Sequence, residues 1–326
     1  MRTAATVAVA VGLALLMTPV DASPLVYPCF RADAPPAIDA DGGDPCWQSK
    51  PLATGFSVLG DGFTEDKQTA FRACWDESAL YFLIVCEEPD VGHLSLDVRD
   101  GGPGWLNDGV EIFVQPGGGD QVYQFVVTAA AARTTGEGAA DFRKVDAAAS
   151  TGERSYTLEI AIPHELLRAE PSVGDIWRGN VCRNIWTTIS GGDKFTTWAP
   201  LQRRFLEPES FAAIEFRGAP PSDEVVTAAT RDLNRRYREH LVAQLRDVAT
   251  EAARYLPVLE EARRSEQFGS AARRLCYRWY RMEQMQVGSE RYSIQDLREM
   301  VQSAEKLVAQ SYELKYAYLI DGLFPD

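Results

Sequence analysis

Hydrophobic and polar positions follow two different patterns along the chain. Between Ala37 and Gly218, short alternating or apolar runs are separated by glycine, aspartate and proline. This punctuation is typical of a β-sandwich. The segments predicted as strands are 69–75, 80–87, 109–115, 123–128, 155–162, 177–184 and 212–216. After Gly218 glycines become sparse and apolar residues recur every three or four positions, which predicts helices.

The helical region carries three apolar stripes. The first runs from Leu241 to Leu259, the second from Phe268 to Met282, where Gly288-Ser289 ends it, and the third from Leu297 to Tyr318. The first helix could extend over about 40 residues, or roughly 60 Å, which is longer than a compact domain requires. We expect an antiparallel hairpin or a three-helix bundle. Either the helices cover one another completely, or part of their surface serves a homo-oligomer or a protein partner.

The N-terminus has the pattern of an export signal. Arg2 precedes an almost unbroken apolar run over residues 4–17, and Val20-Asp21-Ala22 offers a cleavage site. We therefore expect a signal peptide over 1–22, a β domain over 23–218 and a helical domain over 219–326. The apolar run is shorter than the roughly 20 residues of a membrane span. A secreted or periplasmic protein without membrane insertion is expected.

Charge and cysteine content narrow the choice of partners. Asp and Glu number 47 against 33 Lys and Arg, a net charge of −14, which repels nucleic acid. Six cysteines in an exported chain allow up to three disulfides, whose connectivity stays open. A predicted hairpin would place Cys74 opposite about Phe82, which makes Cys86 a poor partner for Cys74. We expect Cys29 and Cys46 to form a local disulfide.

Several motifs follow one another in a fixed order. Residues 37–47 contain Ile-Asp ahead of acidic residues and a Trp, and residues 73–82 and 105–113 read W-D-x-x-x-L-Y and W-x-x-D-x-V-E-x-F. Residues 156–163 read Y-x-x-E-x-x-I-P, and shorter matches lie at 179–183, 197–200 and 208–212. Together these motifs resemble family 9 carbohydrate-binding modules over residues 37–217, with Ala212 in place of a glycine.

The resemblance implies a fold and a kind of site. The fold is an immunoglobulin-like or jelly-roll-like sandwich that holds sugar between two aromatic side chains, with polar groups at one edge and no catalytic machinery. The resemblance says nothing about the helical region. Some members carry structural calcium, and the acidic residues Asp39, Asp41, Asp44 and Asp61 are suitable oxygen ligands. Calcium is therefore a candidate structural ion.

Trp105 and Glu111 are the first candidate site residues. Trp105 follows a glycine-rich loop and precedes Glu111 by six residues. A flat indole ring can cover the C–H face of a sugar, and a carboxylate in an apolar strand needs hydrogen-bonding partners. The alternatives are a structural lid for Trp105 and a structural hydrogen bond for Glu111. Trp47 and Trp75 lie in apolar segments and are predicted core residues.

The second aromatic side chain is ambiguous. Family order favours Trp198, and Trp186 competes because the loop between them is hard to align. Asn180 and Arg183 lie three residues apart on a strand, so at most one of them shares a face with Glu111. We expect that one to be Arg183, whose planar guanidinium stacks and pairs well.

The expected function is that of a secreted, non-catalytic protein that binds a polysaccharide or oligosaccharide. A glycoside hydrolase would need two carboxylates about 5–9.5 Å apart, and Asp108 and Glu111 are too local to suggest such a pair. A second alternative is an interaction protein whose β domain has lost sugar binding and whose helices dock a partner. A third is a haem domain using His93 or His164, although methionine is absent from residues 18–281.

Overall fold

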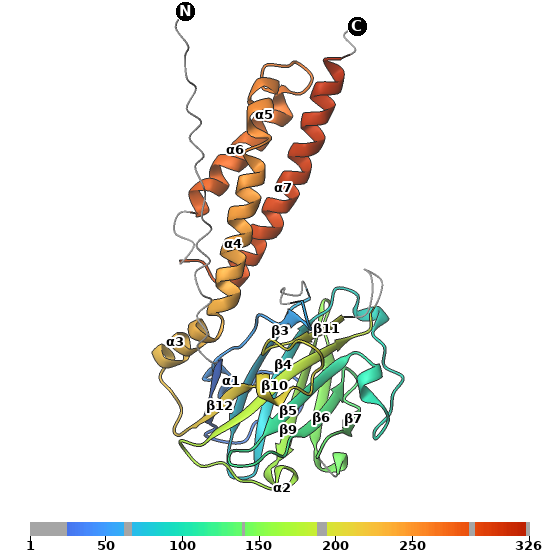
Figure 1. Ribbon diagram of the computed structural model, residues 1–326, viewed down its shortest axis with the longest axis vertical. Helices are drawn as coiled ribbons and strands as arrows, with labels where there is room; N and C mark the ends of the chain where they lie inside the picture. Colours follow the sequence, from blue (N-terminus) through green and yellow to red (C-terminus); the bar gives the residue numbers. More distant parts are fainter. Residues whose placement is uncertain (1–24, 62–66, 139–140, 188–193, 287–290, 324–326) are drawn as a thin grey trace, which may run out of the picture.

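The computed structural model describes residues 25–61, 67–138, 141–187, 194–286 and 291–323. The expected signal peptide lies outside these residues. Figure 1 shows a sheet domain from one end of which a group of long helices rises, with α2 (His164–Leu167) at the opposite end.

The described strands of the N-terminal domain belong to one continuous twelve-stranded sheet. β1 pairs in parallel with both β12 and β3, and so joins two antiparallel arms. The strands along the sheet are β7 (Arg133–Thr135), β6 (Tyr123–Thr128), β5 (Gly109–Gln115), β10 (Ile176–Ile185), β12 (Ala212–Arg217), β1 (Val26–Arg31), β3 (Thr69–Trp75), β4 (Ala79–Glu87), β9 (Ser155–Pro163) and β8 (Asp146–Thr151). β11 (Lys194–Thr197) pairs with β10 and with β2 (Ser57–Val58).

The sheet curls so that its two arms enclose one core. Val110 and Ile112 of β5 belong to the same buried cluster as Phe82 and Ile84 of β4 and Ile160 of β9. The result is a nearly closed, barrel-like sheet, and the predicted two-sheet sandwich is not confirmed. Each predicted strand is present, with ends that agree within one residue. The sequence pattern missed β1, β2, β7, β8 and β11.

The β3–β4 hairpin has a register one residue away from the expected one. Cys74 lies opposite Tyr81, and Ala73 lies opposite Phe82. Cys86 faces Thr69 at the far end of the hairpin, so Cys74 and Cys86 are not partners, as predicted.

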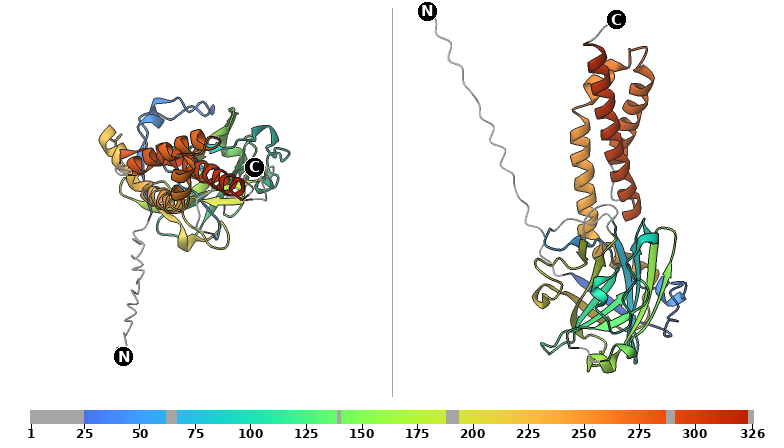
Figure 2. Two further views of the ribbon diagram at one scale, coloured as in Figure 1. Left: turned by 90° about the horizontal axis from the view of Figure 1, so that it is seen from above. Right: turned by 90° about the vertical axis from the view of Figure 1, so that its right-hand side faces the viewer.

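The described C-terminal region forms α3 (Asp223–Leu233), α4 (Arg235–Ala252), α5 (Leu256–Ala262), α6 (Gly269–Gln286) and α7 (Ile294–Asp321). Figures 1 and 2 show α4, α6 and α7 side by side, which roughly supports a three-helix bundle. The expected long first helix is interrupted at Asn234 and again at residues 253–255. Ser293 and Asp296 form a capping box that starts α7. In the part of the chain described, no helix combines the length and apolarity that crossing a membrane requires.

Two sets of contacts attach the helices to the sheet domain. Leu233 at the end of α3 is buried in the main core. The Asn234 side chain accepts the N–H of Thr54 at 2.9 Å and donates to the carbonyl of Leu52 at 2.9 Å. Arg298 of α7 forms a two-pronged ion pair with Glu87, at 2.5 and 2.6 Å. The two regions are therefore joined by specific polar contacts as well as by the chain itself.

Candidate functional site

Glu111 lies in the middle of β5, on the face of the sheet that points away from the main core. Its neighbours Val110 and Ile112 are part of that core, and side chains alternate between the two faces of a strand. In the two adjacent strands, Val126 and Cys182 lie directly opposite Glu111. A carboxylate is thus held on the outer surface of three paired strands.

Two amides hold the Glu111 carboxylate in place. Asn184 donates to Oε1 at 2.8 Å and Gln124 donates to Oε2 at 2.6 Å. The side chain is only 5% exposed. Burial raises the pKa of Glu111 above its ordinary value, because the two amide hydrogen bonds only partly offset the loss of water. Each carboxylate oxygen still has acceptor capacity beyond its single amide partner.

Trp105 lies in the 3-10 turn η2 (Gly104–Leu106), which packs on β5 and β6. Its side chain is 42% exposed. Gly104 lets the turn approach the sheet closely, because a Cβ at that position would meet Val126 at 3.1 Å and Thr134 at 3.3 Å. Since Val126 lies opposite Glu111, the turn that carries Trp105 packs on the same face of the sheet as the carboxylate.

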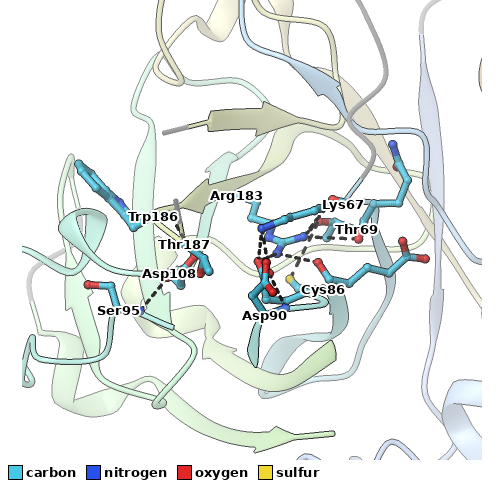
Figure 3. A network of polar contacts seen from close by, with 12 residues as sticks. Lys67, Thr69, Cys86, Asp90, Ser95, Asp108, Arg183, Trp186 and Thr187 are labelled. Atoms are coloured by element: carbon cyan, nitrogen blue, oxygen red, sulfur yellow. Dashed lines mark hydrogen bonds and ion pairs between the residues drawn. The ribbon is translucent and has the colours of Figure 1, made fainter. Parts of the chain in front are cut away.

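Trp186 follows the end of β10, two residues after Asn184. Its indole Nε1 donates to the main-chain oxygen of Trp105 at 2.9 Å, so the two tryptophans are neighbours. Figure 3 shows the Trp186 ring pointing away from Asp108, whose buried carboxylate anchors the segment. Asp108 accepts the N–H groups of Trp186 (2.9 Å) and Ser95 (2.8 Å) and the Thr187 hydroxyl (3.0 Å).

Trp198, the alternative second aromatic residue, is a core side chain. It is 4% exposed and packs edge-on against Phe71, with ring centroids 5.0 Å apart, and against Tyr27. Trp198 is therefore buried in the core, and Trp186 is the tryptophan that contacts Trp105. The rings of Trp47 and Trp75 are also buried, which confirms the prediction for these two residues.

Asn180 shares the outer face with Glu111 but is fully engaged by the protein. Its amide donates to the Thr197 hydroxyl at 2.7 Å and accepts the N–H of Ala199 at 2.9 Å. These bonds tie β10 to the segment after β11. Asn180 therefore has a structural role in this arrangement.

Arg183 points to the opposite face from Glu111, which corrects the expectation that the two would act together. Its guanidinium donates to the carbonyls of Lys67 (3.0 Å) and Glu87 (2.9 Å), as Figure 3 shows in part. It lies 3.5 Å from Glu88 and stacks over the Tyr156 ring. Since the side chain is completely buried, Arg183 holds the two arms of the sheet together and is closed to ligands.

The pattern of residues did not single out Asn184 and Gln124. Both contact Glu111, and both lie on neighbouring strands at positions that share its face. Side chains alternate along residues 177–184, so the even-numbered ones share the face of Glu111. This follows only once Cys182 is known to lie opposite Glu111. That register is a property of the folded sheet.

Two of the four candidate calcium ligands accept hydrogen bonds from the backbone. Asp39 accepts the N–H of Asp41, and Asp44 accepts the N–H of Ala37. Among the described residues, no group of three or more acidic, cysteine or histidine side chains is arranged to hold a metal ion. His164, a candidate haem ligand, is buried with Nε2 2.9 Å from the carbonyl of Asp76.

Comparison with known proteins gives similar solved structures and a family. Similar solved structures include a family 9 carbohydrate-binding module from Caldicellulosiruptor kristjanssonii in complex with cellotriose (19% identity, 61% of this chain and 96% of that chain, TM-score 0.45). Another is a putative carbohydrate-binding protein from Bacteroides uniformis ATCC 8492 (17% identity, 60% of this chain and 100% of that chain, TM-score 0.49). No curated protein sequence matches the chain. The family model "Carbohydrate family 9 binding domain-like" matches residues 38–203, about half of the chain, and the protein therefore belongs to the carbohydrate family 9 binding domain-like family.

Proposed function

We propose that the sheet domain binds a sugar on the outer face of β5, β6 and β10, between Trp105 and Trp186 and above Glu111. The observation that carries the proposal is a nearly buried carboxylate, held by two amides among the described residues, on the same face of the sheet as a turn with an exposed tryptophan. Membership of the family supports carbohydrate as the class of ligand.

The chemistry of these side chains suits a polyhydroxylated ring. An ionised carboxylate has about four acceptor positions, and the amides of Asn184 and Gln124 occupy two of them. The remaining positions can accept adjacent hydroxyl groups through charge-assisted hydrogen bonds. The Trp105 ring offers an apolar surface for the C–H face of the sugar.

The arrangement supports binding without catalysis. Hydrolysis of a glycosidic bond generally needs a second carboxylate that is free to act as an acid, base or nucleophile. Asp108, the nearest candidate in sequence, is buried and spends both oxygens on three donors. We propose that the protein is non-catalytic and, from the export pattern of residues 1–22, that it acts outside the cytoplasm.

Isothermal titration of residues 23–326 against a panel of mono- and oligosaccharides tests the proposal. Trp105→Ala and Trp186→Ala should each weaken binding by roughly tenfold or more, because each removes a stacking face. The melting temperature should stay nearly unchanged for Trp105→Ala, since the ring is exposed.

Leu106→Ala is the matched control, because Leu106 lies in the same turn and is 48% exposed. It should leave the affinity within about twofold of wild type. Equal affinity in wild type and in both tryptophan variants would refute the site. If the wild-type protein bound none of the sugars in the panel, the proposed function would be refuted.

Association through the helices, with a second copy of the chain or with another protein, stays a prediction, and we propose a second copy. The middle of α6 and the C-terminal end of α7 expose large apolar side chains, among them Tyr277 (64%) and Ile320 (55%). Burying such groups between two copies would be favourable. Light scattering of the mature chain tests this, and a monomer at micromolar concentration would contradict it.

A further inference from the structure

The six cysteines, all of them within the described residues, lie in different parts of the molecule. Cys29 and Cys86 belong to the main core, Cys182 to a smaller cluster with Phe113, and Cys276 to the helical bundle. Cys74 belongs to a separate cluster on the outer face of β3, β4 and β9, away from the main core, and Cys46 packs against that cluster. Cys46 and Cys74 therefore share a small cluster, whereas Cys29 and Cys86 are both part of the large main core.

The register of the strands explains why Cys74 faces this cluster. Cys74 lies opposite Tyr81, and Tyr81 lies opposite Ala161, so the three side chains form one row across β3, β4 and β9. All three line the cluster that Cys46 contacts. Cys29, in contrast, lies opposite Phe216 and points with it into the main core. The expected Cys29–Cys46 disulfide is therefore corrected, because the two side chains belong to different faces of the sheet.

The surrounding residues hold Cys46 firmly over Cys74. Cys46 lies in α1 (Pro45–Gln48), next to Trp47. The Trp47 ring is completely buried in the cluster, and its Nε1 donates to Glu159 at 3.0 Å. This anchor leaves little freedom to the neighbouring residue.

Each of the two thiols shifts the pKa of the other. Hydrogen bonding from Cys74 lowers the pKa of Cys46, an effect that outweighs the opposing effect of partial burial. The same contact, together with burial, raises the pKa of Cys74. Cys46 is partly accessible and Cys74 is fully buried. Cys46 therefore has the properties of the attacking thiol, and Cys74 those of the thiol that completes the exchange.

We propose that Cys46 and Cys74 form a disulfide when the protein meets an oxidising disulfide reagent. The Cys46 thiolate attacks one sulfur of oxidised glutathione and displaces the first glutathione thiolate. The Cys74 thiolate then attacks the Cys46 sulfur and displaces the second. Two cysteine protons and two electrons are lost, one S–S bond forms, and one molecule of oxidised glutathione becomes two of the reduced form. In the structure all six cysteines are free.

The disulfide would stiffen the junction with the helices. It fastens α1 to β3, and the chain leaves α1 toward Leu52 and Thr54. The backbone of these two residues binds Asn234 and Thr230 at the start of the helical region. A covalent bond at Cys46 would restrict the motion of the short segment between Cys46 and Leu52, which leads to this junction.

Peptide mapping of the mature chain tests the pairing. The protein is treated with oxidised glutathione, alkylated without reduction, digested and examined by mass spectrometry. A peptide containing Cys46 should be joined to one containing Cys74, and the other four cysteines should be labelled only after unfolding. Free Cys46 and Cys74 after this treatment, or a bond from Cys46 to any other cysteine, would overturn the proposal.

Thermal unfolding gives an independent readout. Reductant should lower the melting temperature of the oxidised sheet domain by about 5–10 °C, because the closed loop restricts the unfolded chain. Cys46→Ala should remove this response to reductant, whatever its own melting temperature. Cys276→Ala, in the helical bundle, is the matched control and should retain it. A response that persists in Cys46→Ala would exclude the Cys46–Cys74 bond as its source.

Discussion

Glu159 of β9 is completely buried, and its carboxylate organises the loop that precedes and includes α1. Oε2 accepts the N–H groups of Asp39 (3.0 Å) and Ala40 (2.8 Å). Oε1 accepts those of Gly42 (3.2 Å) and the Trp47 indole (3.0 Å). The loop also holds Ala40 at a φ of 62°, a left-handed conformation that costs a non-glycine residue roughly 1–2 kcal/mol. The Glu159 carboxylate thus accepts four hydrogen bonds, and these bonds offset the conformational strain at Ala40.

Glu159→Gln keeps the shape of this side chain but replaces one acceptor oxygen with an NH₂ group. The remaining oxygen can keep two of the four donors, and the amide group faces the other two donor to donor. Each lost bond to a charged acceptor is worth about 1.5–3 kcal/mol, so the variant should lose about 3–6 kcal/mol. That is a large part of a typical total stability of about 5–15 kcal/mol.

Denaturant unfolding monitored by tryptophan fluorescence measures the loss, with helical circular dichroism reporting separately on α4, α6 and α7. Only the transition of the sheet domain should move to lower denaturant. Glu153→Gln is the matched control, since Glu153 is exposed, and it should change stability by no more than about 0.5 kcal/mol. A loss below about 1 kcal/mol in Glu159→Gln would refute the reasoning, because the four hydrogen bonds would then contribute little to the fold.

Two further predictions concern the sugar site and the junction. Because the pKa of Glu111 is raised, sugar affinity measured by titration calorimetry should fall as the pH is lowered from neutral toward the ordinary value of 4.5, and it should be independent of pH in Glu111→Gln. An affinity that increases on acidification would contradict this account. The contribution of Glu111 to folding stability has the opposite pH dependence: it is present below the ordinary pKa and is lost as the pH rises through the raised pKa. Asn234→Ala leaves the Thr54 N–H and the Leu52 carbonyl without partners and should cost about 2–4 kcal/mol in denaturant unfolding. Glu239→Ala, on the exposed side of α4, should be nearly neutral, and equal stability of the two variants would show that the junction is not held by Asn234.

The pattern of residues was sufficient for local structure. Alternating or apolar runs predicted the strands at 69–75, 109–115 and 123–128 with the ends that the structure has, because a strand buried on one or both faces needs apolar side chains there. The helical stripes also appear as helices, since an amphipathic face needs only nearby residues to be recognised. The sequence likewise pointed to Trp105 and Glu111, which the fold brings to one surface.

Tertiary structure determined the features that depend on strand pairing, namely the closure of the sheet, the partners of Glu111 and the positions of the cysteines. β1 was not predicted because its parallel partners lie more than forty residues away in sequence, and pairing with β12 and β3 closes the sheet into one curled body. The same pairing places Asn184 beside Glu111 and turns Arg183 to the other face. It also sends Cys29 into the core and leaves Cys74 facing Cys46. Side chains alternate strictly along a strand, so a single register, set by contacts across the whole domain, determines which of them can act together.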